Sequence, residues 1–465
     1  MKPQTYAQHI AYLMRQVYTS PPQNNRAQDY ASSDRSGHDP DAVKRLRILM
    51  LIPELGFGGA EGAFLRLASY LKGHAEVRIA LAAKTSGSTT SSPVGVWTGL
   101  PTVTLDGEGS AKPRRWWRML RHLRNLKREH DVTISFLSGM NVLNALAGPR
   151  SRTIVSERGS KRYNSGQSQW QRVIWTRIID PLTYWRAGRV VAASEGLAHE
   201  IITANPWTAK HVVAIEGTVR GQKLVDAAHL PVEPELQTLA DYETVVAFGR
   251  LHVQKGYDAL LAAFAQVRAR RPAARLLLIG EGPQETHLRE LATQLGLRVE
   301  ASGTDAEVIM PGKRSDPIRY LRLGRVFAFP SRFEGLPNAL IEALAAGVPV
   351  LASDCCWGPR SILSAGTLNY TKACIKLPLM LELGLLMPKP DSHENIKTWA
   401  REMERALTVP RRYAPRELLL SVVTLYDIER TGPVWLRLVE EMARDAERCR
   451  RRTAPRSGYW TARSR

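Results

Sequence analysis

Two glutamates, Glu334 and Glu342, bracket a stretch that can bind a diphosphate. Pro337 lies between them and suits the first turn of a helix, because its missing N–H would be unpaired there in any case. The amides around Asn338 and Ala339 would be free at the helix start, where the positive end of the helix dipole also attracts an anion. We expect Glu334 in the loop before the helix and Glu342 inside the helix, with one carboxylate on each side of this predicted phosphate-binding site.

Two cations on another predicted loop, Arg250 and Lys255, suit the same ligand. They follow the predicted strand at 243–249, so that Arg would supply a fork and Lys a point charge to two phosphates. The structural alternative is that Glu334 caps the helix and that the other three charges are solvated surface residues. Ligands of α/β proteins bind at the carboxyl ends of strands, where both loops lie, and this favours ligand binding.

A glycine-rich turn at 56–61 follows the first predicted strand. Gly59 would let the backbone approach a ligand and would place N–H groups at a helix start. The turn does not fit Gly-x-Gly-x-x-Gly, so a dehydrogenase is not indicated. A plain tight turn is the alternative for this segment.

Strands and helices alternate along the chain in two runs, which predicts an α/β fold with two doubly wound parallel sheets. The two Rossmann-like domains would face each other across a cleft. The predicted boundaries are a disordered tail at 1–44, a first domain at 45–226, a proline-marked linker at 227–241, a second domain at 242–410, closing helices at 411–450 and a basic tail at 451–465.

The composition is that of a globular protein with an anionic partner. The 465 residues include 65 Lys and Arg against 44 Asp and Glu, a net charge of +21. The 4 cysteines form no Cys-x-x-Cys, so neither a disulfide framework nor a zinc knuckle is indicated, and a reducing compartment fits. No run approaches the roughly 18 apolar residues of a membrane span, and no signal peptide is evident. We expect a cytoplasmic protein.

The segment 112–130 predicts a basic helix, with eight Lys or Arg against one acid. Its apolar stripe consists of Trp116, Met119, Leu120, Leu123 and Leu126, and the cations expected largely outside the stripe are Arg115, Arg118, Arg121 and Lys127. Such a helix suits an anionic membrane surface, which would contact Arg114, Arg115, Trp116, Trp117, Arg118 and Arg121. The alternative is a packed helix whose stripe is core, because both have the same amphipathic pattern. Nearby aromatic and basic residues add slightly to the membrane interpretation: Trp170, Arg172, Trp175, Arg177, Tyr184, Trp185 and Arg186.

Nucleic acid is the other anionic candidate, but it is not indicated. The sequence shows no recognised nucleic-acid-binding module and no sheet of aromatic residues on which bases could stack.

These motifs together resemble the group 1, family-4 glycosyltransferases, which have the two-domain architecture called GT-B. The matching pieces are GGAE at 58–61, VSER at 155–158, ASEGL at 193–197, GRLxxxKG at 249–256, GEGP at 280–283 and the Glu-x7-Glu segment from Glu334. The likeness runs from about residue 45 to about 440, and it implies that the last helix returns to the first domain.

The resemblance implies a role for each candidate residue in the second domain. Arg250 and Lys255 would bind the diphosphate of the donor, Glu342 the ribose hydroxyls and Glu334 the transferred sugar. From the first domain, Gly59 would lie by the donor phosphates, and Arg158 near the reacting sugar.

The implied activity is transfer of a hexosyl group from a nucleotide-sugar, expected to be a UDP-sugar, with retention at the anomeric carbon and without a metal or other cofactor. Ser-Glu-Arg at 156–158 resembles the subgroup that acts on polysaccharides and lipid-linked oligosaccharides. We therefore expect a glycan or polyprenyl-diphosphate-linked acceptor at the inner face of the cytoplasmic membrane. Where relatives carry Arg after GGAE, this chain has Gly62. The alternative function is a non-catalytic GT-B binding or scaffold protein.

Overall fold

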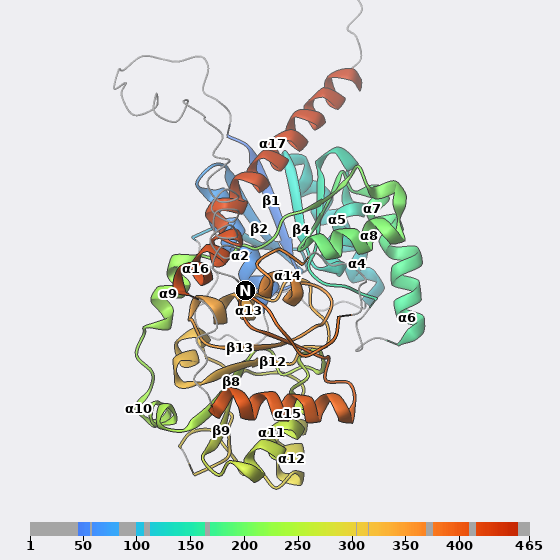
Figure 1. The fold of residues 1–465 in the computed structure, drawn as a ribbon. Helices are drawn as coiled ribbons and strands as arrows, with labels where there is room; N and C mark the ends of the chain where they lie inside the picture. The colour runs from blue at the N-terminus through green and yellow to red at the C-terminus, as the bar shows by residue number, and fades with distance from the viewer. Residues whose placement is uncertain are drawn as a thin grey trace, which may run out of the picture.

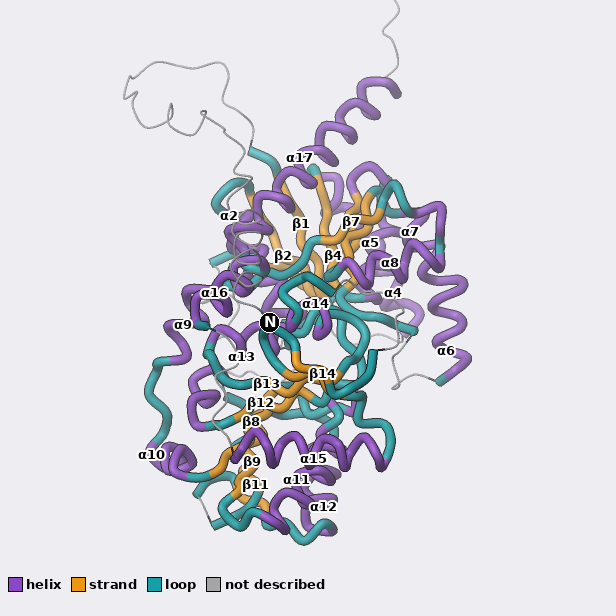
Figure 2. The backbone as a smooth tube through the Cα atoms, in the orientation of Figure 1, coloured by secondary structure: helices purple, strands orange, loops and turns teal. Residues whose placement is uncertain are grey.

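The computed structural model describes residues 45–55, 58–82, 99–106, 112–162, 168–303, 305–314, 316–368, 375–408 and 415–453. The described chain forms two α/β domains, each built on a mostly parallel sheet with helices outside it (Figures 1 and 2). This confirms the predicted fold class. The expected tail at 1–44, Gly56, Cys374 and residues 454–465 lie outside the described residues.

The first sheet has the strand order β3-β2-β1-β4-β5-β6-β7, with every described pairing parallel. Its strands are β1 (Arg47–Ile52), β2 (Glu76–Leu81), β3 (Thr102–Thr104), β4 (Val132–Phe136), β5 (Thr153–Glu157), β6 (Arg189–Ala192) and β7 (Val212–Ala214). The sequence of β1, RILMLI, is apolar after its first residue because this central strand is buried on both faces of the sheet.

Helices connect these strands in chain order. The α-helices are α2 (Gly59–Lys72), α4 (Lys112–Glu129), α5 (Ser138–Ala147), α6 (Gln169–Ile174), α7 (Asp180–Arg186) and α8 (Glu195–Ala204). The next helix, α9 (Gly221–Ala228), follows the last strand, β7, and packs against helices beyond the first domain. A π-helix, η2 (Trp175–Ile179), joins α6 to α7, and short 3-10 helices are η1 (Arg150–Arg152) and η3 (Pro206–Thr208).

The second sheet has the order β10-β11-β9-β8-β12-β13-β15-β14, and only β14 among its described strands is antiparallel to its neighbour. Its strands are β8 (Glu243–Phe248), β9 (Ala274–Ile279), β10 (Val299–Glu300), β11 (Val308–Ile309), β12 (Val326–Phe329), β13 (Val350–Ser353), β14 (Leu379–Met380) and β15 (Leu385–Met387). The helices around it are η5 (Val253–Lys255), α11 (Tyr257–Arg270), α12 (Glu285–Gln294), η6 (Pro317–Leu323), α13 (Asn338–Ala345), α14 (Pro359–Leu363) and α15 (His393–Thr408). In the predicted linker at 227–241, the chain forms two helical turns, α10 (Pro234–Gln237) and η4 (Thr238–Asp241).

The closing helices connect the end of the second domain back to the first. α16 (Arg416–Leu425) packs against α13, and α17 (Ile428–Thr453) packs against α2 and η1. Trp435 and Val439 of α17 are fully buried in the core of the first domain, where the Trp435 ring stacks on Phe136 at 6.2 Å between ring centroids. This is the return to the first domain that the family resemblance implies.

Four of the five residues of the apolar stripe of α4 are core, whereas Trp116, at the start of the stripe, is exposed. Met119, Leu120, Leu123 and Leu126 are buried with Leu49 of β1 and residues of α5. Packing on the sheet therefore decides between the two interpretations that the sequence left open.

One residue of α4 corrects the sequence prediction. Lys127, expected outside the stripe, is buried: its Nζ donates to the Asn144 carbonyl at 3.0 Å, to Asn144 Oδ1 at 2.7 Å and to Thr153 Oγ1 at 2.8 Å. Oxygens on α5 and β5 satisfy the ammonium, which helical periodicity alone does not reveal. Burial lowers the pKa of Lys127 to about 7.

Within the described part of the chain, no helix combines the length and apolarity that crossing a membrane requires.

Candidate active site at the domain interface

The second domain joins two predicted site residues in one ion pair. Lys255 ends η5 after β8, and Glu334 follows β12, the neighbouring parallel strand, so both loops leave the same edge of the sheet. Lys255 Nζ donates to Glu334 Oε1 at 2.6 Å, and both side chains are largely buried. Gln254 Nε2 lies 3.4 Å from Glu334 Oε2 and donates to the Phe333 carbonyl at 2.8 Å. Glu334 therefore does not cap α13, and Lys255 is not a solvated surface cation.

The Glu334 loop touches the first domain. The Glu334 N–H donates to the Cys356 carbonyl at 2.6 Å, and the Trp357 N–H donates to the Glu334 carbonyl at 3.2 Å. A Cβ at Gly335 would lie 1.9 Å from the Arg158 carbonyl oxygen, so only glycine permits this approach. The structure thus brings the backbone of Arg158, in the first domain, against the second-domain loop that carries Glu334.

Arg158 is a cation with little hydrogen bonding around it. Its guanidinium carbon lies 5.3 Å from the centre of the Phe136 ring, and its Nη1 is buried without a hydrogen-bond partner among the described residues. Burial, and then the charge of Arg66, lower the pKa of Arg158 to about 10. A buried cation of this kind suits an anionic or hydroxyl-rich ligand.

The start of α13 differs in part from the predicted phosphate-binding site. The Asn338 N–H donates to the Leu336 carbonyl at 3.0 Å, so the expectation of a free amide there is wrong. The tight turn centred on Pro337 uses the Asn338 N–H for its own hydrogen bond, so this N–H is not available to a phosphate. Asn338 Nδ2 instead donates to the Gly59 carbonyl at 3.1 Å, which places Gly59 of the first domain at the start of α13. The Ala339 N–H has no backbone acceptor among the described residues.

Glu342 and Arg250 each face a charged residue of the first domain. Burial raises the pKa of the half-buried Glu342, whereas the charges of Arg66 and then Lys255 lower it. Arg250 is exposed, and its positive charge lowers the pKa of Glu61, which burial raises. The alternative of a fully solvated Glu342 is therefore not what the structure shows.

Sequence reasoning missed Arg66. Its guanidinium lies over Gly62, with Nη1 3.1 Å from the position that a Cβ there would take, and its Nε donates to the Thr218 carbonyl. Gly62 could have indicated Arg66: where relatives carry Arg after GGAE, this chain has Gly, and the Arg66 guanidinium occupies the space above that glycine. Gln254 was also missed, although it lies between the two predicted cations.

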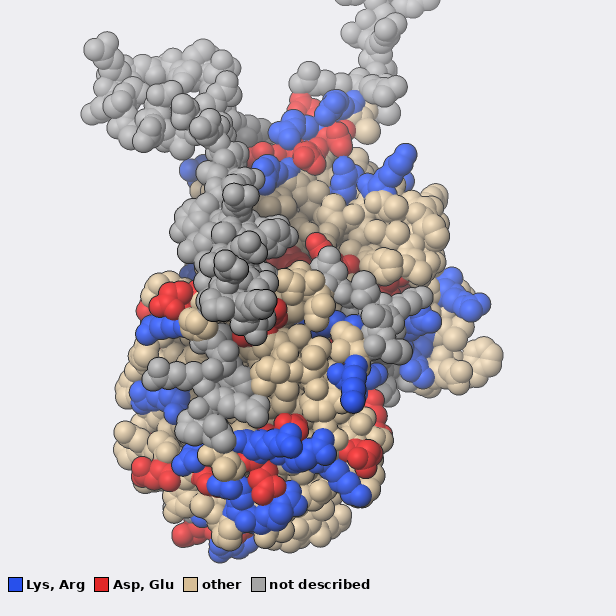
Figure 3. Space-filling view, viewed as in Figure 1, with Lys and Arg blue, Asp and Glu red and all other residues tan. Residues whose placement is uncertain are grey.

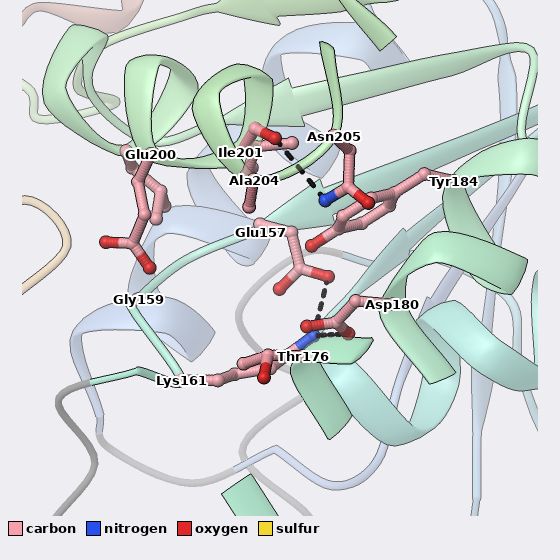
Figure 4. Close-up of a pocket in the computed structure, with 11 residues that line it drawn as sticks. Glu157, Gly159, Lys161, Thr176, Asp180, Tyr184, Glu200, Ile201, Ala204 and Asn205 are labelled. Carbon is pink, nitrogen blue, oxygen red and sulfur yellow. Dashed lines mark hydrogen bonds and ion pairs between the residues drawn. The ribbon is translucent and has the colours of Figure 1, made fainter. Parts of the chain in front are cut away.

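A small polar pocket adjoins this site in the first domain (Figure 4). Lys161 Nζ donates to Glu157 Oε1 at 3.1 Å and also to Asp180, and burial raises the pKa of Asp180 to about 7. Glu200 accepts from Ser160 Oγ at 2.7 Å. The pocket is lined by Glu157, Gly159, Lys161, Thr176, Asp180, Tyr184, Leu197, Glu200, Ile201, Ala204 and Asn205.

Glu200 also links the pocket to the second domain. The Trp357 indole N–H donates to Glu200 Oε2 at 2.7 Å, and the Trp357 ring lies against Gly196. The described residues contain no group of three or more His, Cys, Asp or Glu side chains that could hold a metal ion.

Comparisons with known proteins agree with this architecture. Residues 242–401 match the family model described as "Glycosyl transferases group 1". An uncharacterized glycosyltransferase of Methanocaldococcus jannaschii is 34% identical over 175 residues, 37% of this chain and 41% of the relative. The N-acetylgalactosamine-N,N'-diacetylbacillosaminyl-diphospho-undecaprenol 4-alpha-N-acetylgalactosaminyltransferase of Campylobacter jejuni is 30% identical over 236 residues, 50% of this chain and 60% of the relative. The chain spans between 31% and 41% of the length of the first three curated relatives.

Solved structures define the fold class. Anabaena HepE in complex with UDP and glucose superposes with a TM-score of 0.65 at 17% identity, covering 85% of this chain and 99% of that one. Sucrose-phosphate synthase from Thermosynechococcus elongatus gives 0.61 at 19% identity, covering 86% and 99%. The fold is therefore GT-B. The match to the family model covers the second domain of this fold.

Proposed function

We propose that this protein is a retaining glycosyltransferase that moves a hexosyl group from a UDP-sugar to a lipid-linked or cell-surface glycan. The observation that carries the proposal is the Lys255–Glu334 ion pair, which lies at the domain interface where Arg158 and Gly59 also lie. The family match of the second domain supports the transferase class, and UDP in the HepE structure supports the choice of nucleotide.

In this proposal, the cations of the second domain bind the diphosphate. Donor phosphates compete with Glu334 for Lys255, while Arg250 is exposed and accessible to the second phosphate. Glu334, released from Lys255, then contacts the transferred sugar, and Glu342 accepts hydrogen bonds from the ribose hydroxyls. The two cations offset the negative charge that develops on the departing UDP, so we also propose that no metal is required.

The acceptor approaches from the first domain, where Arg158 and the polar pocket of Figure 4 lie. The Campylobacter relative is named for a diphospho-undecaprenol-linked substrate, which supports a lipid-linked acceptor here. The net charge of the chain is +21, and a basic protein is attracted to anionic lipids. We therefore propose that it works at the anionic inner face of the cytoplasmic membrane.

A thermal-shift panel of nucleotide-sugars tests the donor, because a true donor binds only the folded state. We expect UDP and one UDP-sugar to raise the Tm. Lys255→Ala and Glu342→Ala should each weaken UDP binding by about 1.5 to 3 kcal/mol, the cost of one charge-assisted contact, without unfolding the protein. Equal UDP binding by wild type and both variants would contradict the donor site. UDP binding without transfer to any acceptor would favour the scaffold alternative.

A further inference from the structure

The segment from α6 to α7 exposes large apolar side chains to solvent. We define the docking face as Trp170, Val173, Ile174, Ile178, Leu182 and Trp185, which α6, η2 and α7 present. The exposed fractions of Trp170, Ile178 and Trp185 are 79%, 62% and 58%. Soluble surfaces seldom gather residues of this size, and such a patch indicates a binding partner.

The docking face lies on a helical segment that α7 anchors to the first domain. Its residues recur at three- and four-residue spacing, whereas Asp180, Thr183 and Tyr184 of α7 are buried on the other side. Lys161 binds Asp180, and Ser168 caps the start of α6 in a reciprocal capping box with Gln171. The packed side of the segment is therefore that of α7, whereas α6 and η2 contain no buried residue and project from the first domain with their apolar side chains exposed.

Charge around the docking face selects an anionic partner. Arg172, Arg177 and Arg186 lie in the segment 168–186, whose one acid, Asp180, is buried and bound to Lys161. In Figure 3, blue basic residues and tan surface meet at the right-hand margin of the first domain, where Figure 1 places α6. Cations beside apolar residues, with a Trp toward each end, match the interface of an anionic bilayer, where indoles prefer the headgroup level.

We propose that the docking face inserts into the headgroup region of an anionic phospholipid bilayer. This inference rests on the proposed function, since a lipid-linked acceptor stays in such a bilayer. Thr176, Asp180 and Tyr184 of the same segment line the polar pocket of Figure 4. One segment thus separates the bilayer from the pocket, and the polar end of an acceptor emerges beside it.

The basic helix α4 takes a secondary part. Trp116 and Trp117 are exposed near its start, but Arg115 and Arg118 bind Asp106. The sequence predicted that α4 would anchor the protein to a membrane. The structure favours the docking face as the stronger apolar anchor.

Vesicle flotation tests the proposal. Full-length protein is mixed at low salt with phosphatidylcholine vesicles, with or without one quarter phosphatidylglycerol, and compared with the triple variant Trp170→Ala, Ile178→Ala, Trp185→Ala. We expect binding only to the anionic vesicles, and binding about tenfold or more weaker for the triple variant, because its apolar anchors are gone. Trp207→Ala is the matched control: Trp207 is 47% exposed on η3, and its removal should leave vesicle binding unchanged.

Charge and apolar anchoring separate in a second variant. Arg172→Gln with Arg177→Gln should lower binding at low salt and flatten its salt dependence, whereas the triple variant stays weak at every salt concentration. The UDP-induced Tm shift, which reports the donor site, should be equal in all these proteins. Loss of that shift in wild type would remove the proposed function, whereas a normal shift without flotation would overturn only the docking face. Equal flotation of the wild type and the triple variant would also overturn the docking face as a membrane contact. So would a dimer that the wild type forms and the triple variant does not, because the apolar residues would then bind a second copy of the chain.

Discussion

Lys255 and Glu334 hold each other at 2.6 Å, so each side chain has a partner before any donor arrives. Gln254 and the backbone of Cys356 fix the Glu334 loop from two further directions. When donor phosphates take over Lys255, the contacts with Gln254 and Cys356 still hold the Glu334 loop, so we expect its carboxylate to stay pre-organised for a developing positive charge on the sugar. Its contribution should appear in turnover more than in the binding of UDP.

Glu334→Gln tests this role of the carboxylate. We expect turnover to fall by about a hundredfold or more, while the dissociation constant of free UDP changes by less than about threefold, because the lost charge matters mainly in the transition state. Steady-state kinetics and calorimetry with UDP measure the two effects. A variant with normal turnover would remove Glu334 from the mechanism.

Arg66 is expected to position Glu342 by charge, because its guanidinium attracts that carboxylate more strongly than Lys255 does. Arg66→Ala should weaken UDP-sugar binding by about tenfold, the cost of losing one charged partner. The chain allows a rescue experiment, because the three side-chain atoms nearest to a Cβ at position 62 all belong to Arg66. Gly62→Arg added to Arg66→Ala should restore part of the affinity, whereas Gly62→Ala in the same background should not. If Gly62→Arg restored no more UDP-sugar affinity than Gly62→Ala does, positioning of Glu342 by charge would be refuted.

At the scale of elements, α4 shows how a charged residue can serve as core. Its apolar stripe covers the sheet, and Lys127 reaches across to α5 and β5, where three oxygens accept from its ammonium. The helix therefore depends on a buried cation whose pKa burial lowers to about 7, well below that of a lysine in the unfolded chain.

This shift predicts a pH dependence of stability with a defined sign. Below pH 7, Lys127 is protonated in both the folded and unfolded states, and the folded state bears the full cost of the buried charge. From pH 7 to about 10, the unfolded state binds more protons, so stability rises with pH. Measured by urea denaturation, the unfolding free energy of wild type should therefore increase relative to that of Lys127→Met over this window. A constant difference between the two proteins would contradict the lowered pKa.

At the scale of the whole molecule, the two domains are joined by more than the segment between their sheets. Trp357 donates to Glu200, and Asn338 donates to Gly59, each across the interface. α17 adds a third connection, because it follows the second domain in sequence and packs into the first (Figure 1). The relative placement of the donor and acceptor sides therefore also depends on α17, a helix that contains none of the site residues.

Trp435→Ala should show how much α17 stabilises the molecule. Trp435 is fully buried on Phe136, so removing its ring should cost about 3 to 5 kcal/mol of unfolding free energy. The adjacent Val434 is exposed, and Val434→Ala should change stability by less than about 0.5 kcal/mol. Equal denaturation midpoints for the two variants would mean that α17 is not part of the first-domain core.

The sequence by itself determined the two parallel sheets and the meeting of the Lys255 and Glu334 loops. Apolar strands alternating with amphipathic helices are local signals, and parallel strands place their carboxyl ends at a common edge. Tertiary structure decided what local periodicity cannot distinguish. An amphipathic helix has the same sequence pattern whether its apolar side meets a sheet or a membrane, so α4 became core while α6 and α7 kept an exposed apolar face. Lys127 and Arg66 show the same limit for charges, because their partners lie on other elements, brought near only by packing.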